Sequence, residues 1–435
     1  MTDPQVGVLL IGVLLVLIAL RLPIGAALVA VPFIGIWWLF GWRPAVGALK
    51  AIPFSFAANW QLSSVPMFLM MGFLAYHTGI TRGLFQAARV WLARLPGGLA
   101  VASIFGAAGF ASVTGSSVAC AAAMGRIAVP EMMRAGYDDR LATGAVAAAG
   151  TIGALIPPSI LLILYGIIAQ APISHLFLGG VGAGVLTAVG YCAVVVIWAS
   201  LRPEVAPAVA ERHSLGERLR VLVRVTPTLL LAILVFGGLF AGIFTPTEAG
   251  AVGAVLCTLI AAGSRQLTWP RFRRSLVESF TTSAAIFVIA IGANLLGRFV
   301  TLSGADDYIA EGIAQVAGDR ALLLTGIVLL YLVLGMFLDP LGAMLLTLPI
   351  LLPVARATGM DLLWFGVILA KLLEIGMITP PIGLNVFVIK NVVGDRIGLG
   401  RIFQGVSRFL IADVVVVILL MVFPAIVLFL PSLSK

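Results

Sequence analysis

The sequence predicts an all-α polytopic membrane protein made of two inverted structural repeats. Three observations support this prediction: a shortage of charged residues, apolar segments along the whole chain, and one offset at which helix-breaking residues recur. Of the 435 residues, 61% are hydrophobic and 10% are charged, whereas soluble domains carry about 25% charged residues. Because so few charges cannot cover a surface in water, we expect the chain to be embedded in a lipid bilayer.

The first repeat is predicted to occupy residues 1–201. Its apolar runs approach the roughly 17–25 residues that a helix needs to cross a bilayer. The N-terminal residues Met1 to Gln5 lack a basic region, so we expect the following run to be a membrane helix rather than a cleaved signal peptide. In chain order we expect scaffold helices within 1–95, a hairpin at 98–130, a broken helix at 143–170 and a helix at 176–200.

Residues 98–130 predict a re-entrant helical hairpin. A polar tip from Ser112 to Ser117 separates two arms of about 15 residues, each roughly 22 Å long as a helix. Each arm is therefore shorter than the ~30 Å hydrocarbon core. Hydroxyl groups and the N-terminus of the second arm are suited to holding an ion there. The alternative is one spanning helix whose Ser and Thr hydroxyls bond to their own backbone.

The segment 143–170 contains two adjacent prolines, Pro157 and Pro158. Each proline lacks a backbone N–H, and each disfavours helical geometry in the residue before it. We expect the helix to unwind here and to leave carbonyl groups without partners. At membrane depth such backbone is tolerated only where it is buried in protein or lines a wet cavity, so this break is a candidate site.

Residues 202–225 are the most polar stretch and are predicted to link the two repeats. The second repeat is predicted at 226–435, with scaffold helices within 226–300, a hairpin at 321–353, a broken helix at 363–393 and a helix at 409–431.

Asp339, Lys371 and Glu374 are charged residues of the second repeat that lie in apolar segments. Asp339, at the second hairpin tip, is the most isolated acidic residue at membrane depth and hence a functional candidate. It is also suited to capping the helix that follows. Lys371 and Glu374 are three residues apart, so they can face each other on a helix. We expect a structural pair; the alternative is a role of the pair in coupling.

The two halves are related by a constant offset. Pro380 follows Pro157 by 223 positions, and the same offset relates Pro158 to Pro381 and Gly153 to Gly376. A gap-free spacing shared by helix breakers indicates a duplication. Duplicated membrane halves are typical of secondary transporters, in which the binding site lies where broken helices of the two halves meet. The alternative is a duplication that serves only as a scaffold.

The number of crossings predicts the orientation. If each hairpin turns back inside the membrane, each half crosses five times, so the second half begins on the opposite side. The Arg-rich linker is expected in the cytoplasm because basic loops favour that side, and both termini are expected on the other side. The net charge of +9 is spread over short loops and does not indicate nucleic-acid binding.

An intramembrane hydrolase is a competing class, because the run Gly115-Ser116-Ser117 could contain a nucleophile. Such an enzyme needs a base beside the nucleophile, whereas His77, His175 and His213 lie near segment ends or in the linker. The sequence has no zinc-protease motif and no Gly-rich phosphate loop, and its three cysteines have no metal-like spacing. We therefore expect no enzyme activity and no organic cofactor.

At its hairpin and break motifs the sequence resembles the large membrane subunit, of DctM type, of tripartite ATP-independent periplasmic (TRAP) transporters. The matching stretches are 64–68 with Gly72, 111–119, 150–160 and 376–385, and the resemblance covers essentially the whole chain. It implies an ion-transporter-superfamily fold in the bacterial inner membrane that works as an elevator, in which a transport domain slides against a scaffold. It also implies coupling to a sodium gradient, without ATP.

The same resemblance implies partners and a substrate class. The partners are a small four-helix membrane subunit and a soluble periplasmic substrate-binding protein, and the substrate is an organic acid such as a C4-dicarboxylate, a sialic acid or a sugar acid. The alternative is a sodium–carboxylate symporter of the same superfamily that works alone. Arg298 is a candidate for holding the substrate's carboxylate.

The site residues are carried over by resemblance onto the tips and breaks. One sodium site would use Ser112, Thr114, Ser116, Ser117, Gly153, Ile156 and Pro158. The second sodium site would use Gly335, Asp339, Gly376, Thr379 and Pro381. The substrate would bind at Ser116, Ser117, Pro157, Pro158, Asp339, Pro380 and Asn385. The sequence departs from the family pattern at Val118, where proline is common, and at Asp339–Ala343, where small hydroxyl residues are frequent.

Overall fold

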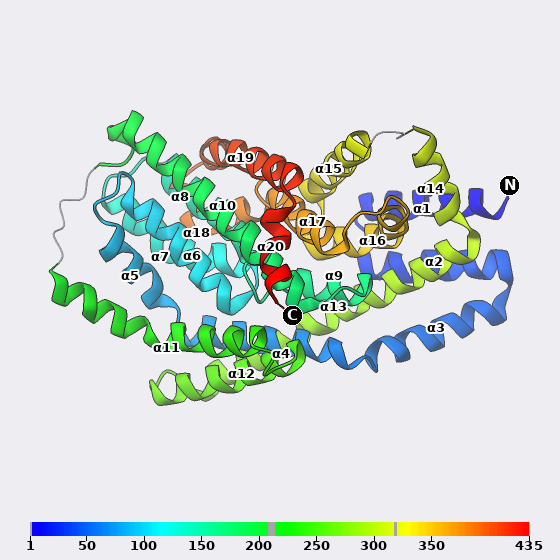
Figure 1. Ribbon diagram of the computed structural model, residues 1–435, viewed down its shortest axis with the longest axis horizontal. Coiled ribbons are helices and arrows are strands. Elements are labelled where there is room, and N and C mark those ends of the chain that lie inside the picture. The colour runs from blue at the N-terminus through cyan, green and yellow to red at the C-terminus, as the bar shows by residue number, and fades with distance from the viewer. Residues whose placement is uncertain (1, 208–213, 317–319, 435) are drawn as a thin grey trace.

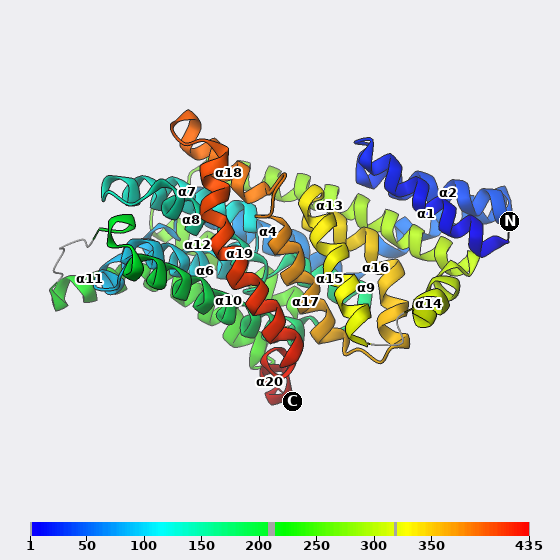
Figure 2. The same ribbon diagram turned by 90° about the horizontal axis from the view of Figure 1, so that it is seen from above.

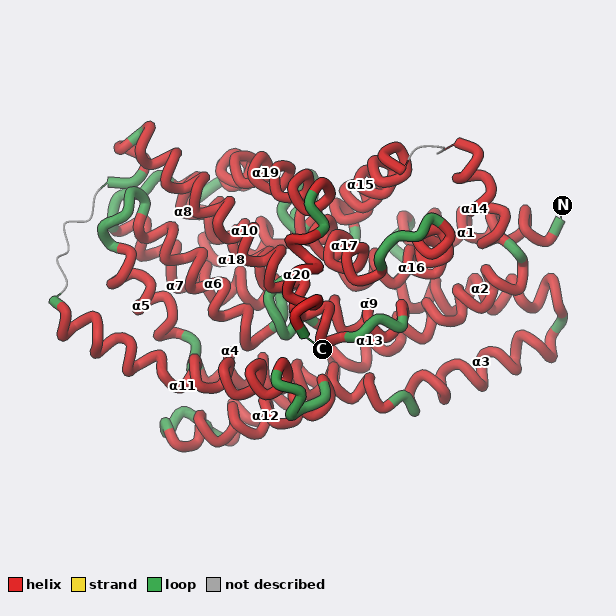
Figure 3. Tube along the Cα trace, in the orientation of Figure 1, coloured by secondary structure: helices red, strands yellow, loops and turns green. Residues whose placement is uncertain are grey.

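The computed structural model describes residues 2–207, 214–316 and 320–434, which form helices joined by loops, with no strand among them (Figure 3). This confirms the predicted all-α fold. Within these ranges six helices are long and apolar enough to cross a membrane: α10 (Ile173–Leu201), α11 (Leu215–Phe240), α12 (Pro246–Gly263), α13 (Trp269–Ser303), α16 (Pro340–Ala357) and α19 (Leu399–Val422).

An outer group of helices consists of the first four helices together with α11 to α14. Helix α2 packs along α13, and α4 packs against both α12 and α13. In Figure 1, α3, α4, α11 and α12 form the lower edge of the molecule. In Figure 2, α1 and α2 lie at one end and α11 at the other. The remaining bounds are α1 (Asp3–Ala19), α2 (Ile24–Phe40), α3 (Trp42–Ala57), η1 (Trp60–Ser63), α4 (Ser64–Thr78) and α14 (Ala305–Val316).

A hairpin group contains two helical hairpins and two broken helices. Helices α6 and α7 pack against each other as one hairpin, and α15 and α16 form the other. The Pro157-Pro158 and Pro380-Pro381 peptide bonds, both cis, lie in the two breaks. The bounds are α5 (Arg82–Leu92), α6 (Gly98–Thr114), α7 (Ser117–Arg134), α8 (Asp139–Gly150), η2 (Thr151–Ala154), α9 (Ile160–Ala169), η3 (Pro203–Val205), α15 (Arg320–Phe337), α17 (Leu362–Gly376), α18 (Leu384–Val393), η4 (Gly394–Arg396) and α20 (Ala425–Leu433).

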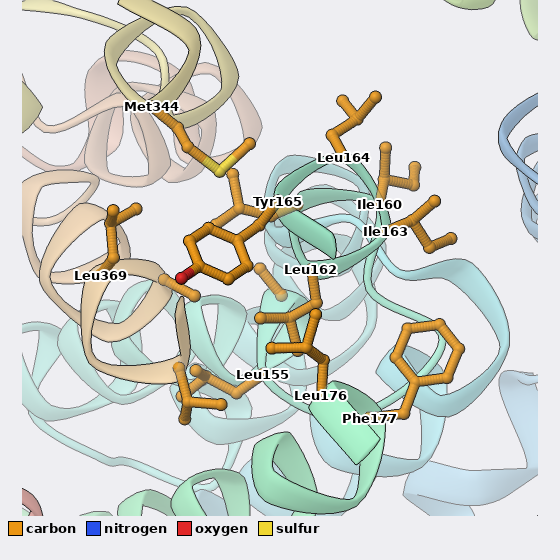
Figure 4. Close-up of a cluster of buried hydrophobic side chains, with 14 of the residues drawn as sticks. Leu155, Ile160, Leu162, Ile163, Leu164, Tyr165, Leu176, Phe177, Met344 and Leu369 are labelled. Carbon is orange, nitrogen blue, oxygen red and sulfur yellow. The ribbon is translucent and has the colours of Figure 1, made fainter. Parts of the chain in front are cut away.

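Apolar packing joins the two broken helices. Figure 4 shows Tyr165 of α9 lying among side chains that include Met344 of α16 and Leu369 of α17, all of them buried. The Tyr165 hydroxyl donates a hydrogen bond to the Leu362 carbonyl at 2.7 Å, which satisfies the only polar group of this buried side chain. The second half of one broken helix is thereby held against the first half of the other.

Three elements differ from the sequence-based expectation, and one of them is α14, which lies between the scaffold helices expected at 226–300 and the hairpin expected at 321–353. Helix α11 begins inside the predicted linker, because the Ser214 side chain accepts a hydrogen bond from the Glu217 amide and caps its N-terminus. The segment expected as one helix at 409–431 is divided, since α19 ends at Val422 and Pro424 precedes α20; a proline has no N–H with which to continue a helix. The linker residues 208–213, which include His213, lie outside the described residues.

Candidate functional site

A cavity of about 250 Å³ lies where both hairpin tips approach the two broken helices and the outer helices α4 and α13. Residues 115–116 form the first tip, and residues 338–339 form the second. Polar groups from three separate elements border the cavity, among them Ser116, Asp339 and Glu374. A concave site with a few convergent polar groups in an otherwise apolar lining is typical of small-molecule binding.

The backbone of the first tip determines its shape. Gly115 has φ +60°, in the left-handed region, and ends α6. Ser116 caps α7, because its side chain accepts a hydrogen bond from the Ala119 amide at 3.4 Å. The helix is therefore interrupted at the tip, which excludes the alternative of one continuous spanning helix.

The first tip packs directly against the first break, residues 151–159. A Cβ atom added to Gly115 would lie 1.9 Å from the Pro158 carbonyl oxygen. A Cβ atom added to Gly153 would lie 3.1 Å from the Ser117 amide nitrogen. The first approach is possible only without a side chain, so Gly115 is required for the Pro158 carbonyl oxygen to reach the tip, whereas at Gly153 a side chain would be tightly packed against Ser117.

The second hairpin meets the second break, residues 377–383, in a similar way. A Cβ atom added to Gly376 would lie 2.4 Å from the Cα atom of Gly335. Asp339 caps α16 and accepts a hydrogen bond from the Gly342 amide at 2.9 Å. Past the break, the backbone N–H of Asn385 donates a hydrogen bond to the Met377 carbonyl at 2.9 Å, which closes the unwound turn.

Four of the predicted site residues border the cavity. They are Thr114, Ser116, Ser117 and Asp339. The others do not line it: Ser112, Gly153, Ile156, Pro157, Pro158, Gly335, Gly376, Thr379, Pro380, Pro381 and Asn385 belong to the hairpin ends and breaks around it. Their roles as ligands stay predictions.

Several of these polar side chains are already engaged locally. The hydroxyls of Ser112, Thr114 and Thr379 donate to backbone carbonyls three or four residues earlier in the chain, so only their oxygen lone pairs are free to bind a ligand. Asn385 is fully buried, and its Nδ2 donates to the Ala147 carbonyl at 3.4 Å. Arg298 lies elsewhere, in a separate polar cavity of about 510 Å³ with Asn59 and Asn294.

The expected pair between Lys371 and Glu374 is not formed. Lys371 Nζ lies 2.5 Å from the Asp413 carboxylate of α19, and both side chains are fully buried. Tyr191 of α10 places its hydroxyl 2.8 and 2.9 Å from the two Asp413 oxygens. Thr151 of η2 lies 2.9 Å from the same hydroxyl. This buried network, Lys371–Asp413–Tyr191–Thr151, joins the first break to three helices.

The sequence favoured a structural role for Glu374 over a coupling role, and the structure places this residue at the cavity. Its spacing from Lys371 indicated a local pair, because i,i+3 residues share a helix face. The true partner of Lys371 is 42 residues away, and nothing in the spacing of the sequence indicates that contact. Tyr76 and Thr282, on the outer helices α4 and α13, also border the cavity.

A second cavity, of about 460 Å³, shares Tyr76 with the first. Its lining includes His77, Arg126 and Arg274. The Glu278 carboxylate contacts His77 Nε2 at 2.7 Å and accepts a hydrogen bond from Arg274 at 2.9 Å. Arg274 is thus paired with Glu278, and Arg126 has no carboxylate partner among the described residues, so this second cavity is suited to attracting an anion at Arg126.

Comparison with known proteins identifies the family. The family model for the DctM component of the tripartite ATP-independent periplasmic transporter matches residues 11–426. The chain belongs to the DctM family. It is therefore a transporter rather than an enzyme, and a multi-pass protein of the bacterial inner membrane, as the six long apolar helices in the described part of the chain also indicate. The hydrolase hypothesis is thus set aside.

Relatives of this DctM protein cover most of its length. It is 33% identical over 389 residues to the C4-dicarboxylate TRAP transporter large permease protein DctM of Pseudomonas aeruginosa, covering 89% of this chain and 90% of that one. It is 32% identical to the sialic acid TRAP transporter large permease protein SiaM of Vibrio cholerae, covering 86% and 87%. It is 34% identical to the isethionate TRAP transporter permease protein DctMQ of Oleidesulfovibrio alaskensis, covering 80% of this chain and 54% of that one.

A solved structure shares the fold of this DctM protein. The YdaH transporter of Alcanivorax borkumensis superimposes with a TM-score of 0.60 over 88% of this chain and 89% of that one, at 15% sequence identity. At this identity the likeness concerns the arrangement of helices alone.

Two substitutions at Asp339 separate its capping role from its charge. Asp339→Ala is expected to lower the free energy of unfolding by about 1 kcal/mol, because the Gly342 amide loses its acceptor. Asp339→Asn retains a side-chain oxygen and should stay within about 0.5 kcal/mol of the wild type. Thermal unfolding of the purified protein in detergent measures both. Equal destabilisation by the two substitutions would contradict the capping role.

Proposed function

We propose that this DctM protein carries out sodium-coupled secondary uptake of a small organic acid across the inner membrane. The observation that carries this proposal is the cavity enclosed by two hairpin tips and the two broken helices in a chain of this family. Three relatives are named for C4-dicarboxylate, sialic acid and isethionate transport. An organic acid is therefore the proposed substrate class.

The proposed sodium sites are the two places where a tip meets a break. The first joins Ser112, Thr114, Ser116 and Ser117 to Gly153, Ile156 and Pro158, and the second joins Gly335 and Asp339 to Gly376, Thr379 and Pro381. Glycines allow the backbones to approach closely at both places. Hard cations prefer oxygen ligands, and unwound backbone supplies carbonyl oxygens without partners. Sodium acts here as the coupling ion, and no organic cofactor is proposed.

The substrate is proposed to bind between the two sodium sites, at Ser116, Ser117, Pro157, Pro158, Asp339, Pro380 and Asn385. Ser116, Ser117 and Asp339 already border the cavity. The second cavity, with Arg126 in its lining, offers a positive charge on a path for an acid to or from this site.

We further propose that the hairpin group moves as one body against the outer group, as an elevator, and that the halves are inverted repeats. The 223-residue offset supports the repeat, since it relates both Pro-Pro breaks. The buried Lys371–Asp413–Tyr191–Thr151 network supports a rigid moving body, because it ties together both broken helices and the helices α10 and α19. In the proposed cycle, a periplasmic binding protein delivers the substrate, and a small four-helix membrane subunit completes the permease.

Reconstitution into proteoliposomes tests this proposal. Uptake of a labelled organic acid is expected only when an inward sodium gradient, the small subunit and the loaded binding protein are all present. Omitting each component in turn, and replacing sodium by choline, measures the contribution of each. Uptake by the isolated chain without the binding protein would favour a standalone symporter. Uptake that does not depend on sodium would overturn the coupling.

A further inference from the structure

Glu374 is a buried carboxylate at the cavity that lacks a balancing charge. Its side chain is 1% exposed and borders the cavity near the end of α17. Its Oε2 atom has no hydrogen-bond partner anywhere in residues 2–207, 214–316 and 320–434. Burying an ionised carboxylate without a partner is costly, so such groups are normally paired or bind a metal ion.

The nearby lysine does not balance this charge. Lys371 is already paired with Asp413, so that pair is neutral and Glu374 contributes one further negative charge. Asp339 also borders the cavity, and none of the described lining residues is lysine or arginine. A site for an organic acid that presents two carboxylates and no cation would repel its substrate. A positive charge must therefore enter the cavity before or with the acid.

The surroundings of Glu374 suit a small cation. Ser117 and Glu374 border the same cavity, and Ser117 follows the tip that packs on the first break. Asn385 is near Ser117, because a Cβ atom on Gly150 would lie 2.9 Å from Asn385 Nδ2 and 3.2 Å from the Ser117 carbonyl oxygen. The Oδ1 atom of Asn385 is likewise buried without a partner in the described chain.

The carboxylate of Glu374 has no counterpart in the first repeat. The 223-residue offset places Thr151 at the position of Glu374 and Ala148 at the position of Lys371. Both halves therefore contain the duplicated break, but only the second half has a carboxylate at this position. We propose that Glu374 is a charged ligand of a sodium ion bound between the first tip and the second break, with the Ser117 hydroxyl as a neighbouring ligand.

This inference rests on the proposed sodium coupling and gives it a physical cause. A sodium ion on Glu374 neutralises the carboxylate, so the acidic substrate can then bind without repulsion. Binding of the cation before or together with the acid follows from this charge balance. The acid cannot reach its full affinity while Glu374 is bare.

The effect of sodium on thermal unfolding of the purified chain tests the assignment. Sodium should raise the unfolding temperature of the wild type relative to choline at equal ionic strength, since a ligand of the folded state stabilises it. Glu374→Gln should be at least as stable as the wild type without sodium, because the unbalanced charge is gone. The apparent sodium affinity of Glu374→Gln should fall roughly tenfold or more, because interactions with an ionised group are stronger than those with a neutral amide. Glu204→Gln, at an exposed carboxylate, is the matched control and should behave as the wild type.

The outcomes distinguish this inference from the proposed function. No sodium response in the wild type would overturn sodium coupling and this inference with it. A normal sodium response in Glu374→Gln would overturn the role of Glu374 alone and would favour a carboxylate that instead contacts the substrate. Unfolding of Glu374→Gln in sodium-free buffer would also overturn the proposal, because removal of an unbalanced buried charge should not destabilise the protein.

Discussion

Lys371→Met is expected to lower the free energy of unfolding by about 3–5 kcal/mol, because it leaves the Asp413 carboxylate buried without its cation. The pair is fully buried, so water cannot replace the lost ammonium group. The Tyr191 hydroxyl still contacts Asp413, but a neutral donor does not cancel the charge. Chemical and thermal unfolding in detergent measure the effect.

The second substitution in this test removes the remaining charge. The double variant Lys371→Met with Asp413→Asn should recover much of the loss, since no unbalanced charge remains. Arg401→Ala is the matched control, because it removes an ion pair to Asp139 that is largely exposed, and exposed pairs contribute about 0–1 kcal/mol. If Lys371→Met cost no more than Arg401→Ala, the buried network would not hold the hairpin group together.

Gly115→Ala is expected to impair transport more strongly than any conservative change elsewhere on the hairpins. An alanine at φ +60° costs about 1–2 kcal/mol. This cost alone lowers the ratio of native to distorted tip conformations roughly 5–30-fold. The added Cβ atom would also lie 1.9 Å from the Pro158 carbonyl oxygen, so the tip must move away from the first break. Sodium-driven uptake in proteoliposomes and the sodium-dependent rise in unfolding temperature should both fall.

A glycine on an exposed helix face provides the control for this substitution. Gly237 of α11 is exposed, and a Cβ atom added there meets nothing within 4 Å. Gly237→Ala should therefore leave uptake and sodium response unchanged, with a small gain in helix propensity. Wild-type uptake by Gly115→Ala would show that the contact between the first tip and the Pro158 carbonyl is not needed for transport.

Much of the fold could be predicted because its signals are local. The tip at Gly115-Ser116 and the Pro157-Pro158 break interrupt their helices through backbone conformations and missing N–H groups that those residues themselves impose. The start of α11 at Leu215 was missed, although Ser214 with Glu217 three residues later is a local N-cap signal. The charged composition of residues 202–225 nevertheless favoured a linker over the helix start that this N-cap signal indicates.

The candidate site was less predictable, because it depends on contacts between distant segments. Glu374 and Lys371 have a spacing that indicates a pair, and only the packing of α19 beside α17 shows that Asp413 takes the lysine. Glu374 then borders the cavity without a counter-charge. Spacing along one helix indicates which side chains share a face, but not which other helix lies against that face.

The sequence by itself determined the membrane class, the helix breakers and the duplicated pattern, because hydropathy and the conformational limits of proline and glycine act within a few residues. Only the tertiary structure decided which oxygens and charges share the cavity. Close approach of Gly115 to Pro158 and of Gly335 to Gly376 depends on how separate helices pack. The inverted pair of repeats predicted at the outset stays a prediction, and the structure adds to it a charge that only one half carries.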